Sequence, residues 1–201
     1  MKIYAILLLT ANSRPADIRA AEYELSQFGF FQRGSVQEFM NFTSQTLAER
    51  TQAGQRQSVE QDSYLIHCFV RPGDKLAAVI ITDQEYPLRV SFTILSKCID
   101  DFAAKFPADT WSTLTPSTAS AQFPVLRETL NKYQDPHAAD NLMRVQRELD
   151  ETKVILHKTI ESVLEREEKL DSLVERSNAL STSTRAFYKT AKKNNQCCSL
   201  M

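Results

Sequence analysis

Several features that enzymes and nucleic-acid-binding proteins use are scarce or missing in this 201-residue sequence. It has four glycines and contains neither GxGxxG nor GxxxxGK[ST], so no glycine-rich phosphate loop is expected. The formal net charge of −1 lacks the basic excess typical of nucleic-acid binders. No nucleophile elbow or paired-carboxylate site stands out. We therefore expect no catalytic residue, no cofactor and no nucleic-acid partner.

Metal-ligand spacing is also missing. The four cysteines, Cys68, Cys98, Cys197 and Cys198, form no CxxC pair, and the three histidines are scattered. No metal site is therefore expected. Cys68 and Cys98 lie in apolar runs, which favours buried, unreactive thiols.

Long hydrophobic runs are absent, since no stretch approaches the roughly 18 apolar residues of a membrane-spanning helix. The short apolar run 3–9 follows Lys2, as in a secretory signal, but it is short and Tyr4 interrupts it. We interpret it as a buried β-strand that begins the fold.

Residues 1–134 predict an α+β domain with an antiparallel sheet between helices. Four strands are predicted, at 3–9, within 17–28, at 63–70 and at 76–83. The last two form a hairpin around a turn at 71–74. Helices are predicted at 35–50, from about 87 to 106, and at 123–133, with a Ser/Thr-rich loop at 111–121. Ser35 and Glu38 have the spacing of a capping box.

The pattern changes after a break at 134–137. An alternating three–four spacing continues for about seven heptads without glycine or proline, which predicts a coiled-coil helix about 75 Å long. The expected organisation is a domain at 1–134, a linker at 135–139, a coiled coil at 140–194 and a tail at 195–201. The seam residues are Leu142, Val145, Leu149, Thr152, Leu156, Thr159, Val163, Arg166, Leu170, Leu173, Ser177, Leu180, Thr184, Phe187 and Ala191.

Arg166 lies in the middle of this seam. In a homodimer two guanidinium groups would face each other without acceptors, at a cost of several kcal/mol per ion. Neutral amide oxygens from other helices would satisfy its five donors, so the seam predicts a hetero-oligomer. Two alternatives remain: Arg166 reaches solvent from a loose seam, or the helix packs back on its own domain.

The segment ELDETKVILHKTIESVLEREEKLDSLVERSNAL (148–180) resembles the R-SNARE motif of the synaptobrevin family. The resemblance implies that Arg166 is the ionic layer of a four-helix bundle, surrounded by glutamines from three Q-SNARE helices. It also implies a SNARE-disassembly ATPase and its adaptor as partners. The first half resembles the profilin-like longin domain, which implies a five-stranded antiparallel sheet between helices. FFQRGSVQEFMNFTSQ (30–45) and AFYKTAKKNNQCC (186–198) resemble the prenylated longin R-SNAREs.

The tail CSLM matches the C-a-a-X pattern. Cys198 is the predicted farnesylated cysteine, and Cys197 is a natural second site for reversible palmitoylation. One lipid gives marginal membrane binding and two give stable anchoring. Nearby Lys189, Lys192 and Lys193 suit either an anionic leaflet or a solvated helix end. A stray cysteine pair is the alternative, although a disulfide between neighbours would be strained.

A protein with a lipid and an unpartnered apolar helix has to cover both. Phe39, Met40 and Phe42 give the helix at 35–50 more apolar side chains than one core-facing stripe requires. We predict that part of this cluster, Phe42 above all, faces outward and receives the folded-back helix or the lipid. The alternative is that all three belong to the core.

The resulting functional prediction is an R-SNARE that docks and fuses vesicles in ER–Golgi, Golgi and endosomal or vacuolar transport. It would be cytosolic or held by its lipids on the cytoplasmic face of those membranes, and its longin domain would inhibit it. Two alternatives are an S-acyltransferase that acts on its own Cys197 and a lipid-anchored longin adaptor.

Overall fold

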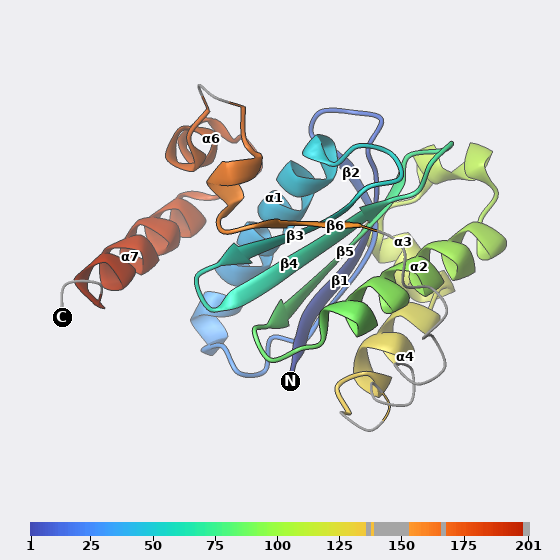
Figure 1. Ribbon diagram of the computed structural model, residues 1–201, viewed down its shortest axis with the longest axis horizontal. Helices are drawn as coiled ribbons and strands as arrows, with labels where there is room; N and C mark the ends of the chain where they lie inside the picture. Colours follow the sequence, from blue (N-terminus) through green and yellow to red (C-terminus); the bar gives the residue numbers. More distant parts are fainter. Residues whose placement is uncertain (136–137, 139–152, 166–167, 199–201) are drawn as a thin grey trace.

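The computed structural model describes residues 1–135, 138, 153–165 and 168–198 and has an α+β fold built on one mixed sheet (Figure 1). The sheet order is β2-β1-β5-β4-β3-β6, and every neighbouring pair is antiparallel except β3 and β6. The strands are β1 (Ile3–Thr10), β2 (Asp17–Tyr23), β3 (Arg56–Gln61), β4 (Tyr64–Val70), β5 (Leu76–Asp83) and β6 (Val154–His157).

Helices cover both faces of this sheet (Figure 1). One face packs against α2 (Leu88–Lys105), α3 (Pro116–Gln122) and α4 (Val125–Lys132), with the 3-10 turn η2 (Ala108–Thr113) between α2 and α3. The other face packs against α1 (Arg33–Arg50). Because β1 lies between β2 and β5 and is covered on both faces, all eight of its residues are buried, as the apolar run predicts.

The hairpin of β4 and β5, the long helix α2 and the short helix α4 agree with the sequence-based predictions. Gly73 supplies the left-handed backbone of the hairpin turn, with φ of +101°. The second predicted strand ends earlier, at Tyr23. The Ser/Thr-rich stretch expected as a loop instead contains α3, because Thr115 and Thr118 cap each other and Pro116 occupies the first helical turn.

Two predictions for the first half were wrong. Strand β3 was missed because its sequence RQSVEQ has one clearly apolar residue, Val59, and the strand is specified by pairing with β4. Helix α1 begins at Arg33, directly after the 3-10 turn η1 (Phe30–Gln32), so Ser35 lies inside the helix and caps nothing. The Glu38 carboxylate consequently bonds elsewhere.

A buried polar cluster lies within the sheet around His67, which is fully buried. Its Nδ1 lies 2.8 Å from Ser58 Oγ, its Nε2 lies 3.4 Å from Thr82 Oγ1, and its ring meets Phe92 edge-on. Burial lowers the pKa of His67 to about 4, so the ring is neutral at pH 7.

The described part of the second half is not one continuous helix. It comprises β6, the 3-10 turn η3 (Ile160–Val163), α6 (Leu170–Arg176) and α7 (Thr182–Cys198). Several apolar residues of the predicted stripe, among them Leu170, Leu180 and Phe187, pack on the α1 face of the first domain, whereas Leu156 is exposed.

Candidate functional site

The candidate site is the surface formed by α1 and the edge of β3, which holds the second half of the chain. In Figure 1 the orange and red segments η3, α6 and α7 lie on the α1 side of the sheet, and β6 extends it beyond β3. The C-terminal residues with 4% or less of their surface exposed are Ile160, Leu170, Val174, Leu180 and Thr184. The four apolar residues of this set join the core cluster under α1, so the second half of the chain completes the core of the first.

Strand β6 is held by backbone pairing at the sheet edge. Its register with β3 runs from Arg56 opposite Val154 to Val59 opposite His157. This pairing leaves Leu156 68% exposed, whereas Ile160, just past the strand, is completely buried. The apolar residue of the predicted seam thus faces solvent, and a residue beside the seam takes the buried position.

Glu38 on α1 caps α7. The carboxylate accepts hydrogen bonds from the Ser181 backbone N–H at 2.9 Å and from the Thr184 hydroxyl at 2.6 Å. Ser181 Oγ in turn accepts from the Thr184 N–H at 3.2 Å. This is the pattern of a capping box, except that the glutamate comes from a helix about 140 residues earlier. The bonds from Thr184 and Ser181 lower the pKa of the Glu38 carboxyl below its usual range.

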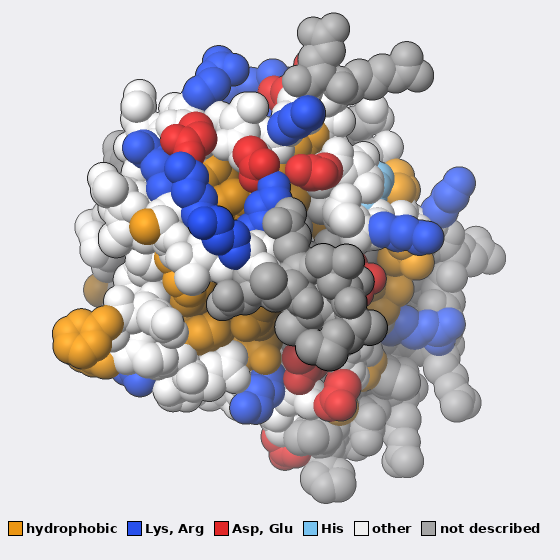
Figure 2. Space-filling view, turned by 90° about the vertical axis from the view of Figure 1, so that its left-hand side faces the viewer, with side chains coloured by type: hydrophobic (Ala, Val, Ile, Leu, Met, Phe, Trp, Pro, Cys, Tyr) orange, Lys and Arg blue, Asp and Glu red, His pale blue; other side chains and the backbone are white. Residues whose placement is uncertain are grey.

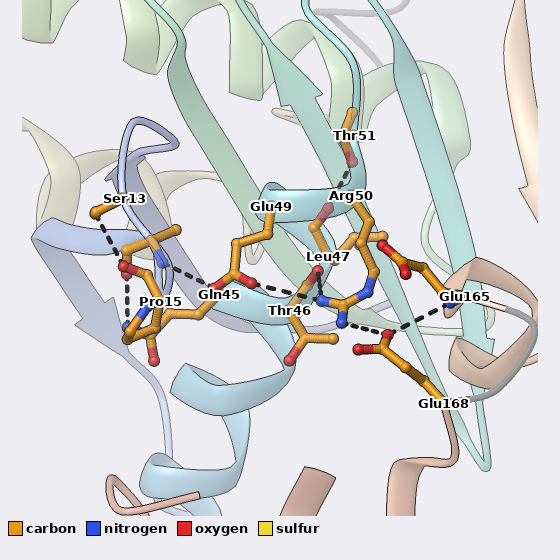
Figure 3. A network of polar contacts seen from close by, with 11 residues as sticks. Ser13, Pro15, Gln45, Thr46, Leu47, Glu49, Arg50, Thr51, Glu165 and Glu168 are labelled. Carbon is orange, nitrogen blue, oxygen red and sulfur yellow. Dashed lines mark hydrogen bonds and ion pairs between the residues drawn. The ribbon is translucent and has the colours of Figure 1, made fainter.

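A second polar contact ties the last turn of α1 to the segment before α6 (Figure 3). Arg50 Nη2 donates to Glu168 Oε2 at 2.7 Å, and Arg50 Nη1 donates to the Thr46 carbonyl. Arg50 lowers the pKa of the Glu168 carboxyl. The adjacent Glu49 accepts from the Ala16 N–H at 2.9 Å, so the end of α1 also fixes the β1–β2 loop.

The aromatic residues of α1 contact different parts of the folded-back chain. The Phe39 ring lies 5.4 Å from the Tyr188 ring of α7, centroid to centroid. Phe42 lines a groove of about 380 Å³ together with Leu173 of α6. Met40 is buried in the core with 6% exposure. Phe39 and Phe42 of the predicted cluster therefore face the C-terminal segment, and the buried Met40 lines the cavity between α1 and that segment.

An apolar cavity of about 420 Å³ lies where α1, the sheet, η3, α6 and α7 meet. Its size is within the range of small-ligand pockets. The wall is mostly apolar and includes Phe28, Phe39, Met40, Ile66, Leu170 and Phe187.

The predicted seam residues divide into three groups. Leu170 and Leu180 are buried, whereas Val163, Leu173, Phe187 and Ala191 are half-buried and Leu156 is exposed. Outside the described residues lie Leu142, Val145, Leu149 and the predicted ionic-layer residue Arg166. Helix α7 reaches Cys197 and Cys198, but nothing is described of their side chains.

Sequence reasoning missed Ile160, Val174, Glu38 and the Arg50–Glu168 pair as parts of this surface. Ile160 and Val174 offered a signal, because both are apolar residues outside the heptad stripe. The two polar contacts offered none, since each joins residues more than 100 positions apart.

Other kinds of site find little support among the residues that the structure describes. Within them no three His, Cys, Asp or Glu side chains gather as metal ligands. The Cys68 and Cys98 thiols are buried, and burial raises the pKa of each to about 12. No described helix combines the length and hydrophobicity needed to cross a membrane.

A longin-type α+β domain followed by a heptad-patterned segment defines a longin SNARE, and comparison with known proteins agrees. The longin family model, described as a regulated-SNARE-like domain, matches residues 25–130, and the synaptobrevin model matches residues 141–199. The chain belongs to the Ykt6-type synaptobrevin homologs. As a member of that family it is a SNARE of vesicle transport, which acts in membrane fusion through complexes with other SNAREs.

Relatives match over the whole length. The chain is 52% identical over 198 residues to the synaptobrevin homolog ykt6 of Schizosaccharomyces pombe, covering 98% of each. It is 50% identical over 201 residues to the YKT6 homolog of Debaryomyces hansenii, covering 100% of each. The corresponding protein of Eremothecium gossypii is 49% identical over 201 residues, again covering 100% of each.

Proposed function

We propose that this protein is an R-SNARE whose longin domain holds it in an inhibited, closed arrangement until Q-SNAREs bind. One observation supports this above the others. The α1 face buries Leu170, Leu180 and Thr184, three positions of the predicted seam. A four-helix bundle needs the same three positions in its core, so one seam cannot serve both partners at once.

Backbone conformation excludes the bundle as well. A continuous helix through the seam requires 154–157 to leave the β3 edge and the break between α6 and α7 to become helical. It also separates Ser181 from Glu38 and Glu168 from Arg50. The closed arrangement and the bundle are thus two states of the same segment, and Q-SNAREs shift the population by binding one of them.

In the open state we propose that the segment joins three Q-SNARE helices, with Arg166 as the ionic layer. A SNARE-disassembly ATPase with its adaptor would return the protein to the pool of free SNAREs. The proposed sites of action are ER–Golgi, Golgi and endosomal or vacuolar transport. These finer assignments depend on the resemblance to prenylated longin R-SNAREs.

We also propose lipid attachment at Cys198 by farnesyl and at Cys197 by palmitoyl. The farnesylated protein would be cytosolic, and the second lipid would hold it on the cytoplasmic face of its target membranes. The apolar cavity beside Phe39, between α1 and α7, would shelter the prenyl chain in the closed state. Its wall combines both halves of the chain, so opening would release the lipid together with the helix.

Mixing the full chain with candidate Q-SNARE segments tests this proposal. We expect a heat-resistant mixed four-helix complex, with a lower melting temperature for Arg166→Ala because the partner glutamines lose their donors. Arg144→Ala, which removes an arginine from the same segment outside the seam, is the matched control. Failure of all Q-SNARE combinations to assemble with the chain would contradict the proposed function.

A further inference from the structure

Helices α6 and α7 are joined by ion pairs that belong to the closed arrangement alone. Lys192 Nζ lies 2.6 Å from Asp171 Oδ2, and Lys189 Nζ lies 2.5 Å from Glu175 Oε1. The later lysine meets the earlier carboxylate, so the two helices run antiparallel. The Tyr188 hydroxyl donates to the other Asp171 oxygen at 2.7 Å and strengthens the same contact.

Both pairs lie on the molecular surface. Each of the four side chains is 40% to 62% exposed. On the face shown in Figure 2, basic and acidic side chains lie next to one another beside hydrophobic groups. The lysines lower the pKa of the Asp171 and Glu175 carboxyls, because each ion pair favours the charged form of its carboxylate.

Neither pair survives in a continuous helix. At 1.5 Å per residue, Asp171 and Lys192 would lie about 32 Å apart along the axis, and Glu175 and Lys189 about 21 Å apart. Both separations exceed the screening length of about 8 Å at physiological salt. Opening therefore leaves the lysines without the negative charge that cancels them when closed.

The lysines also stay outside the predicted bundle. The seam near the end of α7 uses Thr184, Phe187 and Ala191, so Lys189 and Lys192 lie beside it. Assembly with other helices therefore does not bury the two lysine ammonium groups. They are close in sequence to the proposed lipid sites, where the chain would meet a membrane surface.

We propose that Lys189 and Lys192 form a binding surface for anionic lipid headgroups, which Asp171 and Glu175 occupy in the closed state. This inference rests on the proposed function, because it requires opening to a continuous helix. An exposed ion pair changes the equilibrium constant between the closed and open states by up to about fivefold. A lysine at an anionic leaflet increases membrane binding by about fivefold. The opposing effects are of the same order, so opening shifts the lysines from the carboxylates to the membrane.

The test measures binding of the full-length, unlipidated chain to vesicles. The variant Asp171→Asn/Glu175→Gln removes both carboxylate charges with little change in size. We expect about 5- to 25-fold tighter binding to mixed phosphatidylcholine–phosphatidylserine vesicles, lost at high salt. Adding Lys189→Gln/Lys192→Gln should abolish the gain.

Two controls distinguish this effect from simpler ones. Asp101→Asn/Glu128→Gln makes the same change in net charge on α2 and α4, and it breaks the Lys97–Asp101 pair of 2.7 Å. Equal gains for this control would overturn the inference, because net charge alone would explain the result. Equal gains on pure phosphatidylcholine vesicles would also overturn it, because an exposed apolar stripe would then be responsible.

Assembly separates this inference from the proposed function. If the Asp171→Asn/Glu175→Gln variant forms the Q-SNARE complex but binds phosphatidylserine vesicles no better than wild type, the membrane surface is wrong and the SNARE assignment stands. If no variant or wild-type chain assembles, the proposed function itself fails. Glu38→Ala removes the hydrogen bonds that hold the start of α7 on α1 and so favours the open state. This variant should also increase lysine-dependent vesicle binding.

Discussion

Ile160 and Leu156 make opposite contributions to the two proposed states. Ile160 is fully buried in the closed arrangement but lies beside the seam, whereas Leu156 is a seam residue that is 68% exposed when closed. Truncating a fully buried isoleucine to alanine costs about 2–5 kcal/mol, so Ile160→Ala should destabilise the closed state by that amount. Leu156→Ala removes little buried surface and should change closed-state stability by less than about 0.5 kcal/mol.

The order reverses in the bundle. Leu156→Ala removes a core side chain there and should lower the melting temperature of the Q-SNARE complex, while Ile160→Ala should lower it much less. Hydrogen exchange of the β6 amides reports on the closed state, and thermal melting of the complex reports on the bundle. Two alanine variants with the same rank order in both assays would refute the reasoning, because the two states would then bury the same faces.

Three further predictions concern polar groups. Glu38→Ala removes two hydrogen bonds to a carboxylate, so the closed state should weaken by about 1–3 kcal/mol and α7 amides should exchange faster, with Glu128→Ala as control. Arg50→Met should destabilise the closed state by about 1 kcal/mol, because it removes the ion pair with Glu168. Amide hydrogen exchange should become faster at 168–176, while the α7 amides stay protected. Burial lowers the folded-state pKa of His67 to about 4. As the pH falls from 6.5 to 4, His67 therefore takes up a proton in the unfolded chain but not in the folded one. Unfolding free energy should therefore fall by up to about 3 kcal/mol across this window, and His67→Gln should flatten the urea-derived pH profile. An unchanged slope would show that other groups cause the acid sensitivity.

The first half of the fold could be predicted where apolar content and turn chemistry agree. The run at 3–9 and the hairpin of β4 and β5 are examples, because their buried strands are almost continuously apolar. Strand β3 could not be predicted, since its polar sequence carries no β pattern of its own. Its position follows from pairing with β4, which only the folded chain specifies.

The heptad pattern identified the synaptobrevin-like segment but not the conformation described here. A stripe of Leu and Val shows which side chains need burial. It does not show whether partner helices or the chain's own longin domain bury them. The run Val154–His157 can extend on a sheet edge or coil in a bundle, since short apolar runs are ambiguous between strand and helix. Sequence spacing reports only local partners, so it predicts that Glu38 caps its own helix, whereas its carboxylate binds Ser181 and Thr184 at the start of α7.

The proposed competition between the longin surface and Q-SNAREs is tested most directly by comparing assembly rates. The full chain and the segment 135–201 are each mixed with the same Q-SNARE segments, and formation of the complex is followed in time. If the closed state is stabilised by 1.4 kcal/mol or more, the isolated segment should assemble at least about tenfold faster. Equal rates would contradict the account, because contacts that bury Leu170, Leu180 and Thr184 would then not delay assembly.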